Sequence, residues 1–521
     1  MREIRQVVLS CCLPAGCVLA DRVGRPRRGC TLGRHSSRRW VTEMVAGGSP
    51  NEEPLRSAMR DQAVENRSVY LPLPSGQHGH AAELVSADQR ARLNAAMVQI
   101  AAETGYGQTT VEDVLARAGV SRRTFYQHYD NKLDCFLAAC DDVVRYWMHQ
   151  GTLAYQESTA RGITARLRVG LRTLFELVAS DPLGARMIFL ETLNCGREGI
   201  RRLEKAVDEL EGIVERAFAT SDGPAELPPA MITVIVGGVL EIVSARLRHG
   251  ATSELLELAD PLLQWMLVYR APDPAAEIMR ARRALEAATI STKEPNVQDR
   301  DRQRTTDKSS PPLWRDDSVR PIAVRDPRER IIDAAAQIAA ERGYAALSIT
   351  EIDRAAGVSH HTFRRHFKSS DEAFIEAYRA GSKETIAASL TAYNAESTWS
   401  RAVYAGLAAE LHFLSRRPEL ARIGFLEVYA AGPTALELRQ IELQLFTAGL
   451  EPGYQMRRRR GAPPPRIVSE AIAGGIYLLI RECVLHGGSE RLPALAADAT
   501  YAALAPFIGA VAAAAVPCAI A

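Results

Sequence analysis

The 521-residue chain has little net charge and few aromatic residues. Its 64 lysines and arginines nearly balance 62 aspartates and glutamates, so the net charge of +2 is no evidence for a nucleic-acid partner. Affinity for a polyanion would have to come from local basic patches. No apolar run reaches the length of a transmembrane helix, which predicts no membrane partner. The nine cysteines show neither a disulfide framework nor zinc-like pairing, which favours a reduced, cytoplasmic protein.

The signatures of common enzyme sites are also missing. The chain has no phosphate-binding glycine loop, no nucleophile elbow and no His-Glu-x-x-His helix. His360, His361 and His366 lie close in sequence, but their spacing does not bring them to one face of a helix. We therefore expect no enzymatic activity, no metal site and no cofactor.

One pattern of about fifty residues, by contrast, occurs twice. The run Ala-Gly-Val-Ser at residues 118–121 returns at 356–359, and Gly105 returns as Gly343. The separation is the same in both cases (343 − 105 = 238 and 357 − 119 = 238). This period is far longer than the roughly 20 to 50 residues of solenoid repeats. A whole module is therefore duplicated.

Each copy predicts a helix, then a second short helix, a tight turn and a third helix. Thr110 and Ser348 stand where a hydroxyl would cap the middle helix. Gly119 permits a sharp turn, and Ser121 and Ser359 are placed to cap the third helix. This is the layout of a helix-turn-helix, an element that reads DNA.

The first copy resembles the TetR family of bacterial transcriptional regulators. The resemblance rests on the run from Thr110 to Lys132, where glycine, cap, aromatic residues and lysine fall at the family spacing. It implies that Arg122, Arg123 and Thr124 read the major groove and that Tyr126, His128 and Lys132 hold the backbone. It also implies that the middle helix starts near a phosphate. The residues expected at the DNA in this copy are Thr110, Val111, Ser121, Arg122, Arg123, Thr124, Tyr126, His128 and Lys132.

The second copy departs from this pattern. His360-His361 replace the two arginines, Arg364 replaces Tyr126, and Ser370 replaces Lys132. Asp353 brings a charge to a semi-buried position, where it would be costly if unpaired. The second copy therefore either reads a different sequence or binds DNA weakly. Its expected DNA contacts are Ser359, His360, His361, Thr362, Arg364, Arg365 and His366.

The scarcity of strand-like alternation predicts an all-α protein. The duplication and the resemblance together imply two tandem TetR-like modules. By that resemblance, each has an N-terminal three-helix helix-turn-helix domain followed by a helical ligand-binding and dimerisation domain. The expected boundaries are a disordered basic leader (1–85), helix-turn-helix 1 (86–135), regulatory domain 1 (136–287), a flexible linker (288–327), a divergent helix-turn-helix 2 (328–373) and regulatory domain 2 (374–512).

The leader has other interpretations. Residues 1–20 look a little like a bacterial lipoprotein signal ending at Cys17, but export would separate a DNA-binding protein from its DNA. A true start at Met44 or Met59 is the plainer alternative.

The last two helices predicted in each module are strongly apolar and invite a four-helix interface. The paired glycines at 237–238 and 474–475 indicate close helix contact. The modules of one chain could pair as a pseudo-dimer on an asymmetric operator, or whole chains could form a homodimer. Candidate pocket residues, each more often ordinary core, are Phe175, Met187, Leu190, Trp265, Phe413, Phe425, Tyr429 and Tyr477. No convergent polar group identifies a ligand.

These observations predict a sequence-specific DNA-binding transcriptional regulator, of the repressor type, released from a double-stranded operator by an unknown small molecule. The alternative is a ligand-sensing or interaction protein in which one or both DNA-binding domains are impaired.

Overall fold

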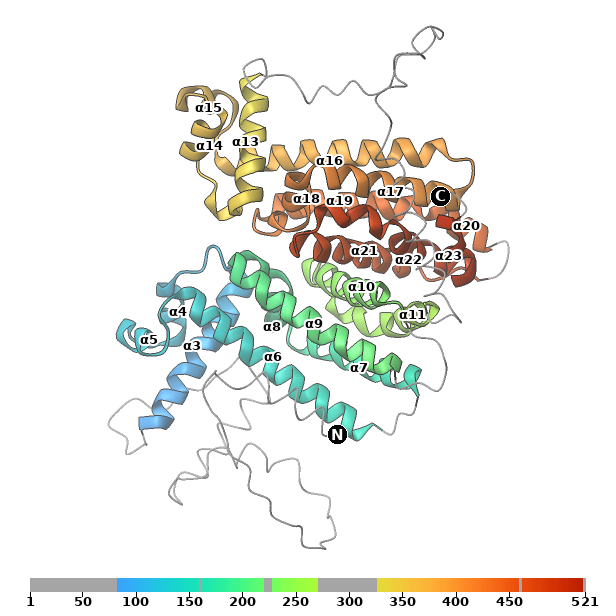
Figure 1. The fold of residues 1–521 in the computed structure, drawn as a ribbon. Helices are drawn as coiled ribbons and strands as arrows, with labels where there is room; N and C mark the ends of the chain where they lie inside the picture. The colour runs from blue at the N-terminus through green and yellow to red at the C-terminus, as the bar shows by residue number, and fades with distance from the viewer. Residues whose placement is uncertain (1–81, 159–161, 220–226, 270–325, 459–461, 519–521) are drawn as a thin grey trace, which may run out of the picture. The chain divides into compact units, whose positions relative to one another are not determined.

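The computed structural model describes residues 82–158, 162–219, 227–269, 326–458 and 462–518 (Figure 1). Every regular element in these ranges is helical, which confirms the predicted all-α class. All of them belong to one compact unit, Pro72–Ala521. The expected leader and linker lie outside the described residues, apart from 82–85 and 326–327, and so do Cys17, Met44 and Met59.

The first module begins with three helices around a small core, which we call the first head. They are α3 (Ala82–Thr104), α4 (Val111–Ala118) and α5 (Arg122–His128), so α3 starts four residues before the expected boundary. Leu93, Met97 and Phe125 are fully buried between them. Burial of such side chains stabilises the head by roughly 1.5–3 kcal/mol each.

Local chemistry fixes the helix ends of the first head as predicted. The Thr110 side chain accepts a hydrogen bond from Asp113 N, and Asp113 Oδ2 accepts one from Thr110 N at 3.0 Å, which completes a capping box. Gly119 ends α4 at φ 63°, a left-handed conformation that favours glycine. Ser121 Oγ then accepts from Thr124 N at 3.1 Å and caps α5.

The rest of the first module is a helical bundle. Residues 182–195 form three short helical pieces in place of one continuous helix. The middle piece is a π-helical turn, where Thr192 Oγ1 donates to the carbonyl of Met187. The elements are α6 (Lys132–Glu157), α7 (Ile163–Ser180), α8 (Pro182–Arg186), η2 (Met187–Glu191), η3 (Thr192–Cys195), α9 (Arg197–Ala219), α10 (Pro229–Arg248), η4 (Thr252–Glu254) and α11 (Leu255–Val268).

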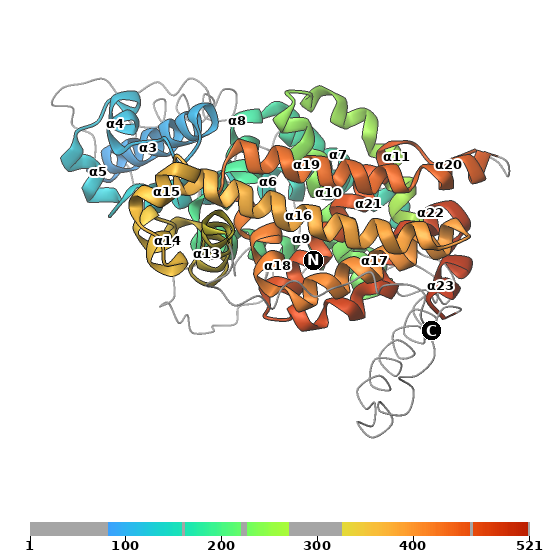
Figure 2. The same ribbon diagram turned by 90° about the horizontal axis from the view of Figure 1, so that it is seen from above.

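The second module repeats this order. Its head, the second head, is α13 (Pro327–Arg342), η7 (Tyr344–Ala346), α14 (Ile349–Ala356) and α15 (His360–His366), gathered at the N-terminal end of α16 in Figure 2. The bundle elements are α16 (Ser370–Ala395), α17 (Trp399–Arg416), α18 (Pro418–Phe425), η8 (Glu427–Tyr429), α19 (Pro433–Gly449), α20 (Glu451–Arg458), α21 (Ile467–Leu485), η9 (Ser489–Leu495), α22 (Ala496–Ile508) and α23 (Ala510–Cys518).

Helices α10 and α21 pack against each other through their paired glycines. A Cβ on Gly237 would lie 2.5 Å from Leu478 Cβ, and a Cβ on Gly475 would lie 2.3 Å from the carbonyl oxygen of Val234. The predicted close helix contact is therefore confirmed, and only glycine lets these two backbones approach so closely.

Helix α10 corrects one expectation. Its length and apolar composition would suffice to cross a membrane, although the sequence analysis finds no run of that length. Buried side chains line it on nearly every side, and 67% of its apolar window is buried inside the protein. Packing against α21 and α11 accounts for its apolar character.

Candidate nucleic-acid interface and ligand cavity

The outward face of α5 carries the polar side chains expected at DNA. Phe125 and Tyr129 face the core, whereas Arg123 is exposed and Tyr126 is 52% exposed. Arg122 is also exposed, but it forms a salt bridge with Glu112 of α4. An exposed pair of this kind is worth only about 0–1 kcal/mol, so Arg122 can exchange Glu112 for another acceptor.

Other expected contact residues of the first head are engaged within it. The hydroxyl groups of Ser121 and Thr124 are hydrogen-bonded at 2.9 Å in the cap of α5, and Thr110 belongs to the capping box of α4. Val111 is half-buried against the core. His128 lies 3.5 Å from Gln89 Oε1; burial and then Arg90 lower its pKa. These residues shape the surface around Arg123 and Tyr126.

Lys132 is placed differently from the expectation that it holds the DNA backbone. Its ammonium donates to the carbonyls of Tyr106 and Thr109, both at 2.9 Å, and lies 4.2 Å from the centre of the Tyr106 ring. Partial burial lowers its pKa. Two of its three N–H donors are therefore committed to the turn between α3 and α4. Lys132 therefore stabilises this turn, and only its third N–H is left for a phosphate.

The side chains on the outward face of the second head form different hydrogen bonds from those of the first head. Asp353 is not unpaired, since its Oδ2 lies 3.2 Å from His360 Nδ1. Arg364, which replaces Tyr126, hydrogen-bonds His360 and the carbonyl of Lys368. Ser359 and Thr362 repeat the cap of the first head. The exposed groups left without such bonds are His361, Arg365 and His366.

Each head is attached to its bundle by one arginine and one glutamate. In the first module, Arg186 Nε donates to the carbonyl of Ala102 at 3.1 Å, and Glu191 Oε2 accepts from Tyr106 N at 2.8 Å. These contacts join α8 and η2 to the end of α3 and the turn that follows it.

The second module has the same attachment. Arg422 Nε donates to the carbonyl of Ala340 at 2.7 Å, and Glu427 Oε2 accepts from Tyr344 N at 2.7 Å. The sequence analysis does not identify these residues. A signal was present, because Arg-x-x-Phe-Leu-Glu stands at 186–191 and again at 422–427.

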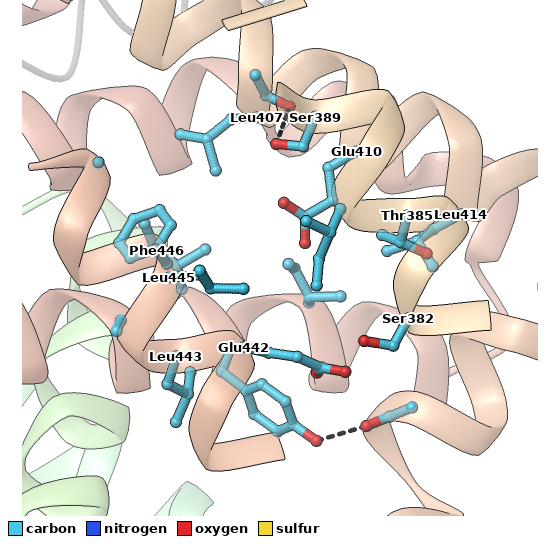
Figure 3. A pocket seen from close by; sticks show the side chains of 18 of the residues that line it. Ser382, Thr385, Ser389, Leu407, Glu410, Leu414, Glu442, Leu443, Leu445 and Phe446 are labelled. Carbon is cyan, nitrogen blue, oxygen red and sulfur yellow. Dashed lines mark hydrogen bonds between the residues drawn. The ribbon is translucent and has the colours of Figure 1, made fainter. Parts of the chain in front are cut away.

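A cavity lies inside the second bundle, among α16, α17, α18, α19 and α21 (Figure 3). Its volume, counted as the space open to the centre of a water molecule, is about 170 Å³. Of the predicted pocket residues, Phe425 and Tyr477 line this cavity, whereas Phe413 and Tyr429 do not. In the first module Phe175, Met187 and Trp265 are core residues, and Leu190 is half-buried beside them.

Two carboxylates enter this cavity, which corrects the expectation that no polar groups converge. Glu410 projects from α17 and Glu442 from α19 (Figure 3). Burial, and then Glu442, raise the pKa of Glu410 to about 7. The sequence did contain a signal, since Glu410 continues the apolar stripe of Val403, Leu407 and Leu414 at helical spacing.

No group of three or more His, Cys, Asp or Glu side chains that could hold a metal ion occurs in the described ranges. The histidines of α15 accordingly do not converge on one site there. His360 bonds Asp353 and Arg364 instead.

Comparison with known proteins gives the same assignment for both heads. A family profile described as "Bacterial regulatory proteins, tetR family" matches residues 93–139 and again residues 331–377. The HTH-type transcriptional activator FasR of Mycolicibacterium smegmatis is 28% identical over 126 residues. That alignment covers 24% of this chain and 56% of the relative, so the chain spans little more than half of FasR.

Two solved structures are similar over about one module. The fatty acid degradation regulator FadR from Bacillus halodurans is 22% identical with a TM-score of 0.32, and the similarity covers 34% of this chain and 94% of FadR. A TetR-like transcriptional regulator from Rhodococcus sp. RHA1 is 15% identical with a TM-score of 0.30, covering 35% of this chain and 96% of the other.

The two profile matches fall on the two three-helix heads, which share their caps, their left-handed glycine and their attachment to the bundle. Each head therefore matches the tetR family of bacterial regulatory proteins, and the two matches fit two tandem TetR-like modules in one chain.

Proposed function

We propose that this protein is a cytoplasmic, sequence-specific DNA-binding transcriptional regulator whose two modules act as a pseudo-dimer within one chain. The first head supplies most of the DNA affinity, and the second reads a dissimilar half-site. A small molecule in the cavity of the second bundle changes the affinity for the operator.

The exposed face of α5 is the observation that carries the proposal. Arg123 and Tyr126 project from a helix that Phe125 fixes on its inner side, and Arg122 has only an exposed partner in Glu112. Arginine is the side chain that most often pairs with guanine in the major groove. In the second head, His360 and Arg364 already bond within the head, which supports a weaker contribution.

The pairing of modules is supported by the contact between α10 and α21. Backbone approaches that exclude a Cβ occur on both helices, at Gly237 and at Gly475. Such close packing is typical of a stable interface and not of a passing contact. A homodimer of whole chains is the competing arrangement.

Regulation is supported by the position of α18. Its residues Leu420 and Ile423 line the cavity, while Arg422 on the same helix and Glu427 just after it hold the second head. A ligand shifts the equilibrium between two positions of the second head only if it binds the protein better in one position than in the other. We propose that the ligand lowers the affinity for DNA and so relieves repression. FasR is named an activator, so activation of transcription is the competing outcome.

An impaired second head is the alternative that a specific observation favours. If the bonds of His360 and Arg364 persist on DNA, the second module would serve only to sense the ligand and to pair with the first. Selection of bound sequences from random DNA separates the two, since two dissimilar half-sites are expected from the proposal and a single half-site from the alternative.

The double variant Arg122→Ala/Arg123→Ala tests the DNA contact. On the selected operator we expect a loss of about 1–3 kcal/mol for each arginine that contacts a guanine. Arg172→Ala, which removes an exposed arginine of α7 in the bundle, is the matched control and should leave affinity unchanged. Equal operator affinity of the double variant and the control would refute the assignment of α5.

A further inference from the structure

The cavity of the second bundle is apolar on most sides. Leu407 and Leu414 of α17, Leu443 and Phe446 of α19 and Ile476 of α21 form much of its wall. A site of this kind favours a ligand with a hydrocarbon or aromatic body. What it selects beyond that depends on the few polar groups in the wall.

Those polar groups are dominated by two carboxylates without a cation of their own. Glu410 makes no hydrogen bond or ion pair with another described residue, and the interaction found for it is repulsion by Glu442. Glu442 Oε2 accepts from Tyr378 Oη at 2.8 Å. Ser382 also bonds this carboxylate, but neither hydroxyl supplies a positive charge. Buried carboxylates without a counter-charge are unfavourable and attract a cation.

The nearest cation in the bundle is already committed. Arg439, on the same helix as Glu442, donates to Glu241 Oε2 at 2.7 Å and lies 4.0 Å from the centre of the Tyr477 ring. It lowers the pKa of Glu442 only as the smallest of the influences on that group, and burial outweighs it. Among the described residues, therefore, no cation forms an ion pair with either carboxylate of the cavity.

We propose that this cavity binds a cationic amphiphile, an amine or quaternary ammonium with an apolar body, with its charged group between Glu410 and Glu442. The proposal names the ligand class for the regulation proposed above. It is tested by binding alone, so it can fail or succeed whether or not the ligand releases DNA.

The first module is not built for such a ligand. The two bundles are offset by 236 residues at this point (418 − 182 = 236), so Glu410 corresponds to Leu174 (410 − 236 = 174). Leu174 packs against the apolar core. One cation per chain is therefore expected.

Binding should also displace a proton. The pKa of Glu410 is about 7, raised by burial and by Glu442, so near neutral pH this group carries a proton part of the time. A cation favours the ionised form. Affinity should rise by about tenfold in all from pH 6 to 8, and level off above the pKa, if one proton is released.

The test is calorimetric titration of the full chain with three compounds that share an octyl chain: octyltrimethylammonium, octanol and octanoate. We expect the cation to bind best, octanoate worst, and the heat to vary with the ionisation enthalpy of the buffer. Glu410→Gln and Glu442→Gln should each lower the affinity for octyltrimethylammonium by about tenfold or more. Glu437→Gln, an exposed glutamate on α19, is the matched control.

The outcomes separate clearly. Tighter binding of octanoate than of the cation, or unchanged cation affinity in both glutamine variants, overturns the proposal. So does the absence of any cation binding at millimolar concentration. If the cation binds as expected but leaves the affinity for the operator unchanged, the ligand class stands and the proposed regulation is wrong.

Discussion

Arg439 of the second module and Glu241 of the first form a buried ion pair. Arg439 Nη2 and Glu241 Oε2 are 2.7 Å apart, and the side chains are 3% and 10% exposed. Burial raises the pKa of Glu241, but Arg439 and Arg248 outweigh it and hold the pKa below its usual range. Because Arg439 also stacks on Tyr477, one side chain joins the module interface to the wall of the cavity.

Removal of one partner from this pair should destabilise the protein strongly. Glu241→Gln leaves Arg439 buried without its counter-charge, which costs about 3–5 kcal/mol. Arg439→Met should cost less, because Glu241 keeps its bond to Arg248 at 2.8 Å. The double variant Glu241→Gln/Arg439→Met removes both charges of the pair and should recover much of that loss. Urea denaturation of the four proteins gives the coupling energy.

The exposed pair of Arg168 and Asp260, 2.8 Å apart, is the matched control. Its loss in Asp260→Asn should change stability by about 0–1 kcal/mol. Additive losses in the double variant of the buried pair would contradict the contact between Glu241 and Arg439.

The glycines of α10 and α21 give a second prediction. In Gly475→Ala the new Cβ would meet the carbonyl oxygen of Val234 at 2.3 Å, so the helices must separate. We expect a loss of about 1–3 kcal/mol, as for other overpacked cores. Gly170→Ala, on the exposed face of α7 with open space around its Cβ, should instead stabilise by up to about 1 kcal/mol. A thermal melt of both variants checks the opposite signs; equal shifts would argue against the tight contact.

The attachment of the first head gives a third prediction. Glu191→Ala leaves the N–H of Tyr106 without its acceptor, which costs about 1–3 kcal/mol for a buried donor. Hydrogen exchange should therefore quicken at Tyr106 and in the neighbouring turn, and not in the second head. Glu191→Gln retains an acceptor oxygen and should restore slow exchange. Slow exchange in the alanine variant would show that this bond does not hold the head.

The heads could be predicted from sequence because their determinants are local. Thr110 bonds Asp113 and Ser121 bonds Thr124, each three residues away, and Gly119 supplies the turn between them. The side-chain roles were harder, since a lysine that holds backbone carbonyls, as Lys132 does, looks the same in sequence as one that holds a phosphate.

The cavity could not be predicted because its determinants are distant in sequence. Glu410 and Glu442 are 32 residues apart (442 − 410 = 32), and only the tertiary fold, which places α17 and α19 around one cavity, makes both face one space. Glu241 and Arg439 are separated by 198 residues and by the boundary between modules. Nothing local marks either pair.

The pKa of Glu410 gives a fourth prediction, on stability without ligand. Its value of about 7 lies above the ordinary 4.5, so the folded state binds this proton more tightly than the unfolded state. The stability that it contributes is fully present below pH 4.5 and is lost as pH rises through 7. Glu410→Gln should therefore be more stable than wild type at pH 8, by about 1–3 kcal/mol, and hardly more stable at pH 4. A gain of equal size at both pH values would contradict the raised pKa.

The central claim is that the two modules of one chain pair and read one operator together. Analytical ultracentrifugation with the selected operator measures this directly through the mass of the complex. The proposal predicts one 57.0 kDa chain per duplex, on two dissimilar half-sites. Two chains on one palindromic duplex would show that identical modules pair across chains and would contradict it.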